Sequence, residues 1–179
     1  MIAASLRNRN AYAAVVKLYE VRLRRYIRRL LGNHAALVED VLQETFIKAY
    51  INLKDYDLTR NFAPWIFRIA HNEAISILRK RKLDPATVDL ESAALILDRM
   101  TDGRDGHSEL LAKDQAKQIQ QAMSTLDQRY KDVLVLRYLE ERSYDEISEI
   151  LAIPPGTVAT NINRGLKQLQ KYLISSGQA

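Results

Sequence analysis

Residues able to recognise nucleic acid recur at helical spacing between positions 65 and 79. Trp65, Arg68 and Asn72 fall on one side of a helix drawn at 100° per residue, and Ser76 and Arg79 continue that side. Arginine binds phosphate, asparagine can read a base edge, and an aromatic ring stacks on unpaired bases. The pattern therefore favours contact with nucleic acid. The alternative, in which Trp65 packs in the core and the arginines are merely solvated, stays open on these residues alone.

A second pattern lies in the segment 36–53, where acidic and apolar side chains share the side of a helix that should face outward. Isoleucines are unusual on a solvated surface, although single exposed apolar residues are common. The segment is therefore either an ordinary exposed face or a stripe that binds another protein. The predicted core side holds Val38, Val41, Leu42, Thr45, Phe46, Ala49 and Leu53. The predicted outward side holds Asp40, Gln43, Glu44, Ile47 and Ile51.

The segment 143–171 has the pattern of a helix-turn-helix. Ser143 and Glu146 match a capping box at the start of a short helix. The run 154–156, Pro-Pro-Gly, then predicts a turn, and Thr157 is expected to cap the last helix. A plain antiparallel helical hairpin is the alternative. Side chains suited to the major groove and to phosphates lie on the exposed face of the last helix, namely Thr160, Asn163, Arg164, Lys167 and Lys171.

Apolar residues recur at helical spacing almost throughout, and no convincing period-two strand is present. We therefore predict an all-α fold with two small helical domains, residues 1–82 and 111–179, joined by a flexible acidic linker over residues 83–110. Pro85, Gly103 and Gly106 and an acidic excess mark that linker. The predicted helices span residues 11–31, 36–53, 62–82, 111–123, 127–139, 144–152 and 157–172.

Net charge also differs between the two halves of the chain and the segment that joins them. Residues 1–82 hold 16 Lys and Arg against 7 Asp and Glu, a net charge of +9 that suggests a polyanionic partner. Residues 83–114 hold 3 against 8, and residues 115–179 hold 8 against 7. A hydrophobic fraction of 47% argues against a wholly disordered chain.

The sequence offers little for catalysis. It contains no cysteine, its three histidines lack metal-ligand spacing, and no phosphate-cradling glycine loop or nucleophile–base arrangement is evident. We predict no enzymatic activity, no cofactor and no metal. No signal peptide and no apolar run of membrane-spanning length occur, so we expect a soluble cytoplasmic protein without membrane insertion.

Several stretches in the right order resemble the extracytoplasmic-function (ECF) sigma factors of bacterial RNA polymerase. Residues 36–50 (ALVEDVLQETFIKAY) and 62–72 (FAPWIFRIAHN) with 78–81 (LRKR) resemble region 2. Residues 136–139 (LRYL), 143–147 (SYDEI) and 155–158 (PGTV) resemble region 4. Together these stretches imply a sigma factor that binds core polymerase, recognises the −10 and −35 promoter elements and stabilises strand opening.

The resemblance also implies a role for each surface. Asp40, Gln43 and Glu44, with Ile47, match positions that dock on the coiled coil of the polymerase β′ subunit. The loop 55–61 and Asn72 match the elements that capture a flipped base of the −10 element, and flipping costs a few kcal/mol. Region 4 would bind the −35 element and the β flap, and the linker would run toward the RNA exit path. The implied −10 contacts are Asp57, Arg60, Asn61, Phe62, Trp65, Arg68, Asn72 and Arg79. The implied −35 contacts are Thr157, Ala159, Thr160, Asn163, Arg164 and Lys167.

The family also implies an anti-sigma partner, and the chain departs from the family pattern in places. Ala159 stands where a basic residue is common and Asn161 where arginine is common, which should weaken phosphate anchoring. Ser148 replaces a common alanine and Ala152 a common glycine, and the first helix is expected to be short. Two other functions were weighed. A stand-alone regulator binding duplex DNA as a dimer would explain only the C-terminal half, and a helical adaptor would bind no nucleic acid.

Overall fold

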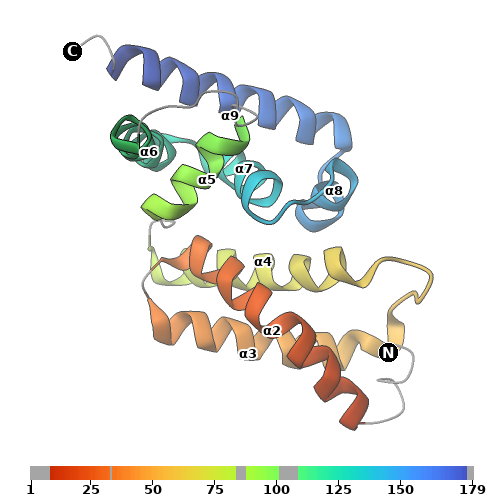
Figure 1. The fold of residues 1–179 in the computed structure, drawn as a ribbon. Coiled ribbons are helices and arrows are strands. Elements are labelled where there is room, and N and C mark those ends of the chain that lie inside the picture. Colours follow the sequence, from red (N-terminus) through yellow and green to blue (C-terminus); the bar gives the residue numbers. More distant parts are fainter. Residues whose placement is uncertain (1–8, 33, 84–87, 101–108, 177–179) are drawn as a thin grey trace. The chain divides into compact units, whose positions relative to one another are not determined.

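The computed structural model describes residues 9–32, 34–83, 88–100 and 109–176. Every secondary-structure element in those ranges is helical (Figure 1), which confirms the predicted all-α fold. The chain divides into two compact units that meet in sequence between Pro85 and Ala86. Among the helices of the described ranges, none combines the length and the apolar composition that crossing a bilayer requires.

The first unit is a bundle of three helices in which every pair is in contact. Figure 1 shows α2 running obliquely across α3 and α4. Its core takes side chains from each helix, and the fully buried rings of Tyr26 and Phe67 have centroids 5.2 Å apart. A 3-10 turn, Leu53–Asp55, follows the second helix. The three helices are α2 (Arg9–Leu31), α3 (Ala35–Asn52) and α4 (Phe62–Arg81).

Local sequence determines where these helices end. Gly32 has a φ of 68°, a left-handed conformation that glycine adopts without a Cβ clash, and its N–H donates to the Arg28 carbonyl at 2.7 Å. At the start of α4, the Asn61 side chain accepts a hydrogen bond from the Ala63 N–H at 3.2 Å. Pro64 fits the first turn because its missing N–H would have no partner inside the helix. The predicted helix boundaries in this unit hold to within one residue, except that α2 begins at Arg9, two residues before the predicted start.

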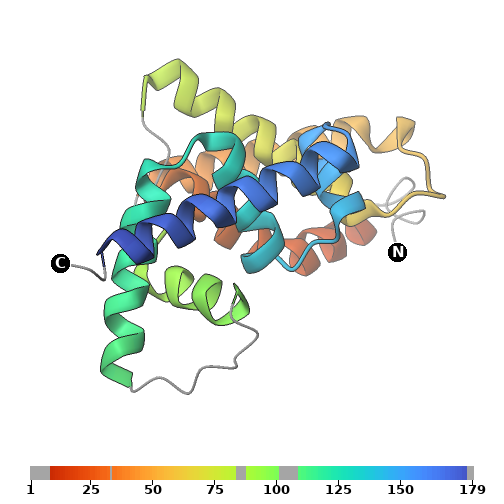
Figure 2. The same cartoon turned by 90° about the horizontal axis from the view of Figure 1, so that it is seen from above.

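The second unit contains five α-helices and one wider turn within residues 88–100 and 109–176. Figure 2 shows α9 lying across α6, and α9 also packs against α7. A close approach between α7 and α9 requires Gly165, because a Cβ there would meet the Leu134 side chain at 3.0 Å. The elements are α5 (Leu90–Met100), α6 (Glu109–Thr125), α7 (Gln128–Leu134), a π-helical turn (Val135–Leu139), α8 (Tyr144–Leu151) and α9 (Pro155–Ser176).

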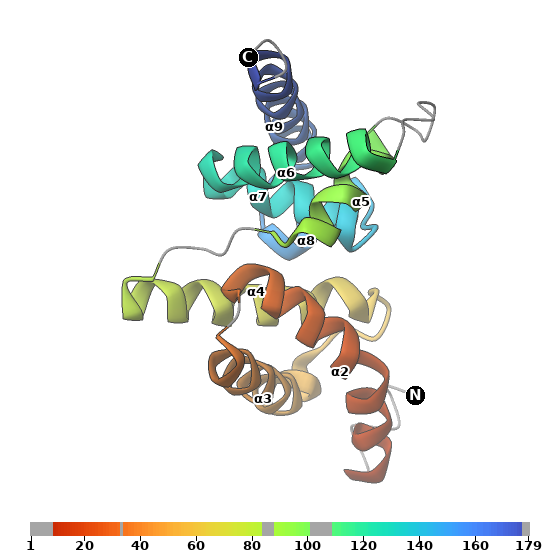
Figure 3. The same cartoon turned by 60° about the vertical axis from the view of Figure 1, so that its left-hand side comes forward.

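The prediction of a flexible linker over residues 83–110 was wrong for residues 90–100, which form α5. Figure 3 shows α5 beside α6, and Ala93 and Ile96 of α5 are fully buried. One of the acidic residues that suggested a linker, Asp89, lies at the start of the helix, where its side chain accepts from the Ser92 N–H at 2.8 Å. The segment 101–108, which carries the two glycines, lies outside the described residues.

Two further expectations need correction. The single helix predicted over residues 127–139 is interrupted by the π-helical turn, in which the Glu140 N–H donates to the Val135 carbonyl at 3.1 Å. The last helix begins at Pro155, two residues before the predicted cap Thr157. Proline has a pre-set φ and no N–H, so it suits the first helical position, and Thr157 instead lies in the first turn.

Candidate interaction surfaces

The outward side of α3 is the acidic and apolar stripe expected from the sequence. Asp40, Gln43 and Glu44 are exposed, and Ile47 and Ile51 keep 44% and 60% of their surface accessible. The opposite side of the helix is buried. Of the predicted core residues, only Phe46 is partly exposed. We call the four residues Asp40, Gln43, Glu44 and Ile47 the α3 stripe.

A groove between α2 and α3 extends the apolar character of this region. Its volume is about 460 Å³, and Val21 at its edge is 70% exposed. Arg24 crosses one side of the groove, where its guanidinium bonds Glu20 at 2.7 Å and Glu39 at 2.8 Å. Sequence reasoning missed Val21. The available signal was two apolar residues three positions apart, Leu18 and Val21, on the same outward side of α2.

The nucleic-acid face of α4 is exposed at its polar positions and packed at its aromatic ones. Arg68, Asn72 and Arg79 are exposed, whereas Trp65 is half-buried. Phe62 retains only 4% exposure, so its implied direct contact with DNA needs correction. Its ring lies in a cluster with Trp65 at 5.1 Å, and with Tyr56 and Tyr19 at 5.4 Å each. Phe62 therefore supports Trp65 and the preceding loop from the buried side.

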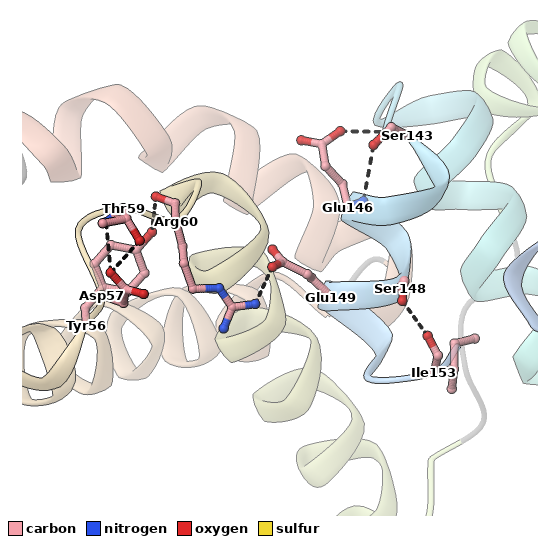
Figure 4. A network of polar contacts seen from close by, with 9 residues as sticks. All are labelled: Tyr56, Asp57, Thr59, Arg60, Ser143, Glu146, Ser148, Glu149 and Ile153. Carbon is pink, nitrogen blue, oxygen red and sulfur yellow. Dashed lines mark hydrogen bonds and ion pairs between the residues drawn. The ribbon is translucent and has the colours of Figure 1, made fainter. Parts of the chain in front are cut away.

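The loop before α4 is held by hydrogen bonds within itself (Figure 4). The Asp57 carboxylate accepts from the Thr59 N–H at 2.9 Å and from its hydroxyl at 2.7 Å, and these bonds lower the pKa of Asp57. The Tyr56 hydroxyl donates to the Arg60 carbonyl at 2.7 Å. The predicted contact Asn61 caps α4, which occupies its side-chain oxygen. The remaining predicted residue, Arg60, is exposed.

In the second unit, the short helix α8 begins with the predicted capping box. The Glu146 N–H donates to the Ser143 hydroxyl at 3.2 Å, and the Ser143 N–H donates to the Glu146 carboxylate at 2.9 Å (Figure 4). The helix ends at Leu151 and is followed by Ala152, whose φ of 54° is costly for a residue with a Cβ. The hydroxyl of Ser148 donates to the Ile153 carbonyl at 2.6 Å across this turn. The two departures from the family pattern, Ser148 and Ala152, therefore lie at the same turn.

The outer face of α9 presents polar side chains without aromatic rings. Val158 and Ile162 are buried and fix the rotation of the helix about its axis. Ala159 is half-buried, and Asn161 retains only 9% exposure. The Thr160 hydroxyl donates to the Gly156 carbonyl at 2.8 Å, which leaves its methyl group and an oxygen lone pair for other contacts. The exposed residues of the predicted −35 set are Thr157, Thr160, Asn163, Arg164 and Lys167.

Comparison with known families identifies this arrangement. Residues 15–83 match the family model of Sigma-70 region 2, and residues 116–169 match that of Sigma-70 region 4. The chain is 37% identical to the ECF RNA polymerase sigma factor SigW of Bacillus subtilis over 171 aligned residues. The alignment covers 93% of this chain and 90% of SigW. The chain belongs to the ECF RNA polymerase sigma factors. It directs transcription initiation by RNA polymerase.

Other relatives agree with this family. The sigma factor SigM of Bacillus subtilis is 31% identical over 79% of this chain and 82% of its own length. Two solved structures share the fold. CnrH in complex with the cytosolic domain of CnrY has a TM-score of 0.65 at 23% identity, covering 97% of this chain and 95% of that one. The sigma factor RpoE with the anti-sigma factor NepR from Bartonella quintana has a TM-score of 0.61 at 22% identity, covering 91% and 96%.

Burial strongly shifts the pKa of one side chain in each unit, His71 in the first and Asp132 in the second. In the first unit, Nδ1 of His71 lies 2.9 Å from the Tyr26 hydroxyl, and burial lowers the pKa of His71 to about 4. In the second unit, Asp132 accepts a hydrogen bond from the Gln128 amide at 2.6 Å, and burial raises the pKa of Asp132 to about 7. Neither side chain reaches an exposed interaction surface. His71 belongs to α4, which carries one of those surfaces, and Asp132 belongs to α7, which packs against α9.

Proposed function

We propose that this sigma factor binds core polymerase through the α3 stripe, captures the melted −10 strand with α4 and its preceding loop, and reads the −35 element with α9. The observation that carries the proposal is the α3 stripe itself. Acidic side chains repel DNA, and exposed isoleucine contributes nothing to solubility, so the stripe suits a protein partner. Its combination with two basic, polar helix faces suits a protein that connects polymerase to promoter DNA.

The polymerase contact would combine charge and apolar burial. Asp40 and Glu44 would pair with basic side chains of the β′ coiled coil, while Ile47 would be buried against it. Val21 lies in a groove lined on its other side by α3 residues Val38 and Glu39, so we add Val21 to the proposed contact. Residues at the centre of an interface, where water is excluded, contribute most of the binding free energy.

At the −10 element, the proposed contacts divide by chemistry. Arg68 and Arg79 would bind phosphates, Asn72 would hydrogen-bond a base edge, and Trp65 would stack on an unpaired base. The preformed loop 56–61 would form the pocket wall for the flipped base. Because its hydrogen bonds exist before DNA arrives, capture costs little ordering entropy, which helps to offset the lost base stacking.

At the −35 element, α9 would lie in the major groove. Thr157 and Thr160 offer methyl groups for thymine, Asn163 can bond an adenine edge, and Arg164 can bond guanine or phosphate. Lys167 would contact a phosphate. The half-buried Ala159 would contribute close packing and no charge. We further propose that the second unit contacts the β flap, that residues 83–110 run toward the RNA exit path, and that the protein acts in the cytoplasm.

An anti-sigma factor is a proposed regulatory partner. Both solved structures of similar fold hold a second protein, which in the RpoE complex is the anti-sigma factor NepR. For this chain, an inhibitor that covered the α3 stripe would block polymerase binding directly. Its test is competition, in which the inhibitor and core polymerase cannot be bound at once.

The primary test is run-off transcription from a pool of promoter fragments, with core polymerase and with or without this protein. We expect initiation from a subset of fragments only when the protein is present. The double variant Asp40→Ala with Glu44→Ala should lower that product more than tenfold and abolish co-elution with core polymerase. The matched control removes two exposed acids of the second unit, Glu91→Ala with Asp114→Ala.

Each outcome of the transcription test leads to a different conclusion. Initiation that is lost with the stripe variant and kept with the control supports the proposed polymerase contact. Equal activity of the two variants would remove the α3 stripe from the interface. Tight binding of promoter duplex by the protein alone, with no initiation when core polymerase is added, would overturn the recruitment mechanism.

A further inference from the structure

The helix α5 lies between the two regions that match sigma-factor family models and belongs to neither. The region 2 match ends at residue 83 and the region 4 match begins at residue 116, whereas α5 spans residues 90–100. In the fold, α5 packs against α6 (Figure 3) and against the π-helical turn. It is therefore an additional helix of the second unit, seated on elements that belong wholly or partly to region 4.

Polar bonds hold α5 near both of its ends. At the start, the Gln120 amide of α6 donates to the Val88 carbonyl at 3.0 Å. At the end, the Arg99 guanidinium donates to the Tyr138 carbonyl and forms an ion pair with Glu141. Bonds of this kind contribute little net free energy, because water replaces them on release. They set the position of α5 without making its docking permanent.

The apolar contact between α5 and the rest of the second unit is small. Among residues 88–100, the buried apolar side chains are Val88, Ala93 and Ile96. Their burial must offset the ordering of an eleven-residue helix, and a helix of this length is marginal in water by itself. The docked and released states of α5 are therefore expected to differ little in free energy.

With α5 docked, region 4 offers little apolar surface to a protein partner. Within residues 116–169, Tyr144 is the one large apolar side chain that is exposed. Protein interfaces, in contrast, have a core of apolar side chains from which water is excluded. The elements under α5 contain such side chains, since Ile119 of α6 and Leu136 and Leu139 of the π-helical turn are buried. Release of α5 is the change that would expose apolar surface on both elements.

We propose that α5 occupies a protein-binding surface of region 4 and that the β flap of core polymerase displaces it. The inference rests on the proposed contact between the second unit and the flap, and it adds an internal competitor to that contact. Because α5 fits the surface, it also indicates the chemistry of the flap segment that replaces it. That segment would carry apolar side chains three positions apart, as Ala93 and Ile96 are, and a cation that pairs with Glu141 in place of Arg99.

A cross-link that holds α5 in place tests this competition. The chain contains no cysteine, so Arg99→Cys with Glu141→Cys supplies its only thiols, and a short bis-maleimide can join them because the native side chains meet. The full-length double variant is titrated against core polymerase and against core polymerase from which the β flap has been deleted. We expect the cross-link to lower the affinity for complete core about tenfold and to leave the affinity for flap-deleted core unchanged. The same variant capped with a monofunctional maleimide is the control.

A variant that loosens α5 should have the opposite effect. Ile96→Ala removes a fully buried side chain and should raise the affinity for complete core about threefold, which general damage to the unit would not do. Leu95→Ala is the matched control, because Leu95 is 37% exposed on the same helix. Its affinity for complete core should equal that of the wild type.

The results that would overturn the competition are specific. Cross-linked and capped protein could bind complete core equally well, the cross-link could weaken binding to both cores alike, or Ile96→Ala could fail to raise the affinity. Failure of the proposed flap contact has a different signature. In that case the wild type itself binds complete and flap-deleted core with the same affinity, and the competition is overturned together with the contact.

Discussion

The two helices proposed to contact DNA, α4 and α9, offer it different chemistry. The α4 face combines two arginines and an asparagine with Trp65, which rests on the buried ring of Phe62. The exposed face of α9 carries threonines, Asn163, Arg164 and Lys167, with no aromatic ring between residues 157 and 167. Aromatic rings contact base faces, which are accessible only in single strands, whereas short polar side chains reach base edges in an intact major groove. The difference fits the proposed division, in which α4 holds a melted strand and α9 binds duplex.

The net charge around the two helices differs in a way that agrees with this division. The first domain, residues 1–82, carries a net charge of +9, whereas residues 115–179 are nearly balanced. A strand that has left the duplex must be held by phosphate contacts as well as stacking, and a dense positive charge supplies them. Recognition of duplex edges depends more on shape and hydrogen-bond geometry. This difference can be tested with substitutions that should impair promoter opening and spare duplex binding, or the reverse.

The largest expected effect comes from Trp65. Trp65→Ala should reduce promoter opening about a hundredfold, because it removes both the stacking surface and the support of the loop. Binding to duplex DNA that ends upstream of the −10 element should stay within twofold. Permanganate footprinting and a duplex gel-shift assay with holoenzyme measure the two quantities, and Trp65→Phe is the control for folding. Equal losses in both assays would remove the proposed division between the helices.

His71 should make the first unit sensitive to acid. Its pKa is about 4 in the fold and about 6.5 unfolded, so the neutral form stabilises the folded state. This contribution is full above pH 6.5 and is lost as the pH falls toward 4, which amounts to about 2 kcal/mol by pH 5. Trp65 is the only tryptophan, so its fluorescence during urea unfolding at pH 7.5 and pH 5 reports on this unit. His71→Gln should flatten the dependence, and identical midpoints for the wild type would contradict it.

Phosphate anchoring by α9 is expected to have a moderate effect. Arg164→Ala with Lys167→Ala should weaken binding of holoenzyme to −35 duplex about tenfold near physiological salt. The slope of log K against log salt should fall by about two, since each lost phosphate contact contributes about 0.9. Binding to a single-stranded −10 oligonucleotide should be unchanged. A salt titration by fluorescence anisotropy decides, and an unaltered slope would show that neither side chain contacts a phosphate.

A further prediction concerns Asp132 in the second unit, and its sign is opposite to that of His71. Burial raises the pKa of Asp132 to about 7 from an ordinary 3.8, so folding favours the protonated form. Its contribution to stability is full below pH 3.8 and is lost as the pH rises toward 7. Amide exchange of α7, corrected for intrinsic rates, should show stronger protection at pH 5 than at pH 8. Asp132→Asn should remove that difference, and greater protection at pH 8 would reverse the proposed sign.

Helical spacing predicted the exposed faces because periodic burial is a local property of sequence. The outward positions of α3, including Ile47 and Ile51, are exposed as predicted, and the capping box at Ser143 is present. The pattern could not show that Phe62 is buried, because its partners Tyr19 and Tyr56 come from other parts of the chain. Asparagine is a favoured N-cap residue, but the family resemblance assigned Asn61 a DNA contact, and the structure shows that it caps α4.

The second unit held more that the sequence could not show. Acidic residues near Asp89 resembled a linker because a helix cap and a solvated loop use the same residue types. The π-helical turn after Leu134 adds one residue to a turn, and a period of 3.6 does not reveal it. Gly165 was not singled out, because the reason for it is the Leu134 side chain of another helix.

The docking of α5 also limits how far the two halves of this sigma factor can separate. Leu83 is bonded to the end of α4, and Val88 is bonded to α6 through the Gln120 amide. Five residue steps cannot exceed about 18 Å, whatever their conformation. With α5 released, the tether would extend to the start of α6, and its upper limit would grow to about 90 Å. If α4 and α9 bind the two promoter elements as proposed, a docked α5 would therefore restrict the promoter spacings that one molecule can span.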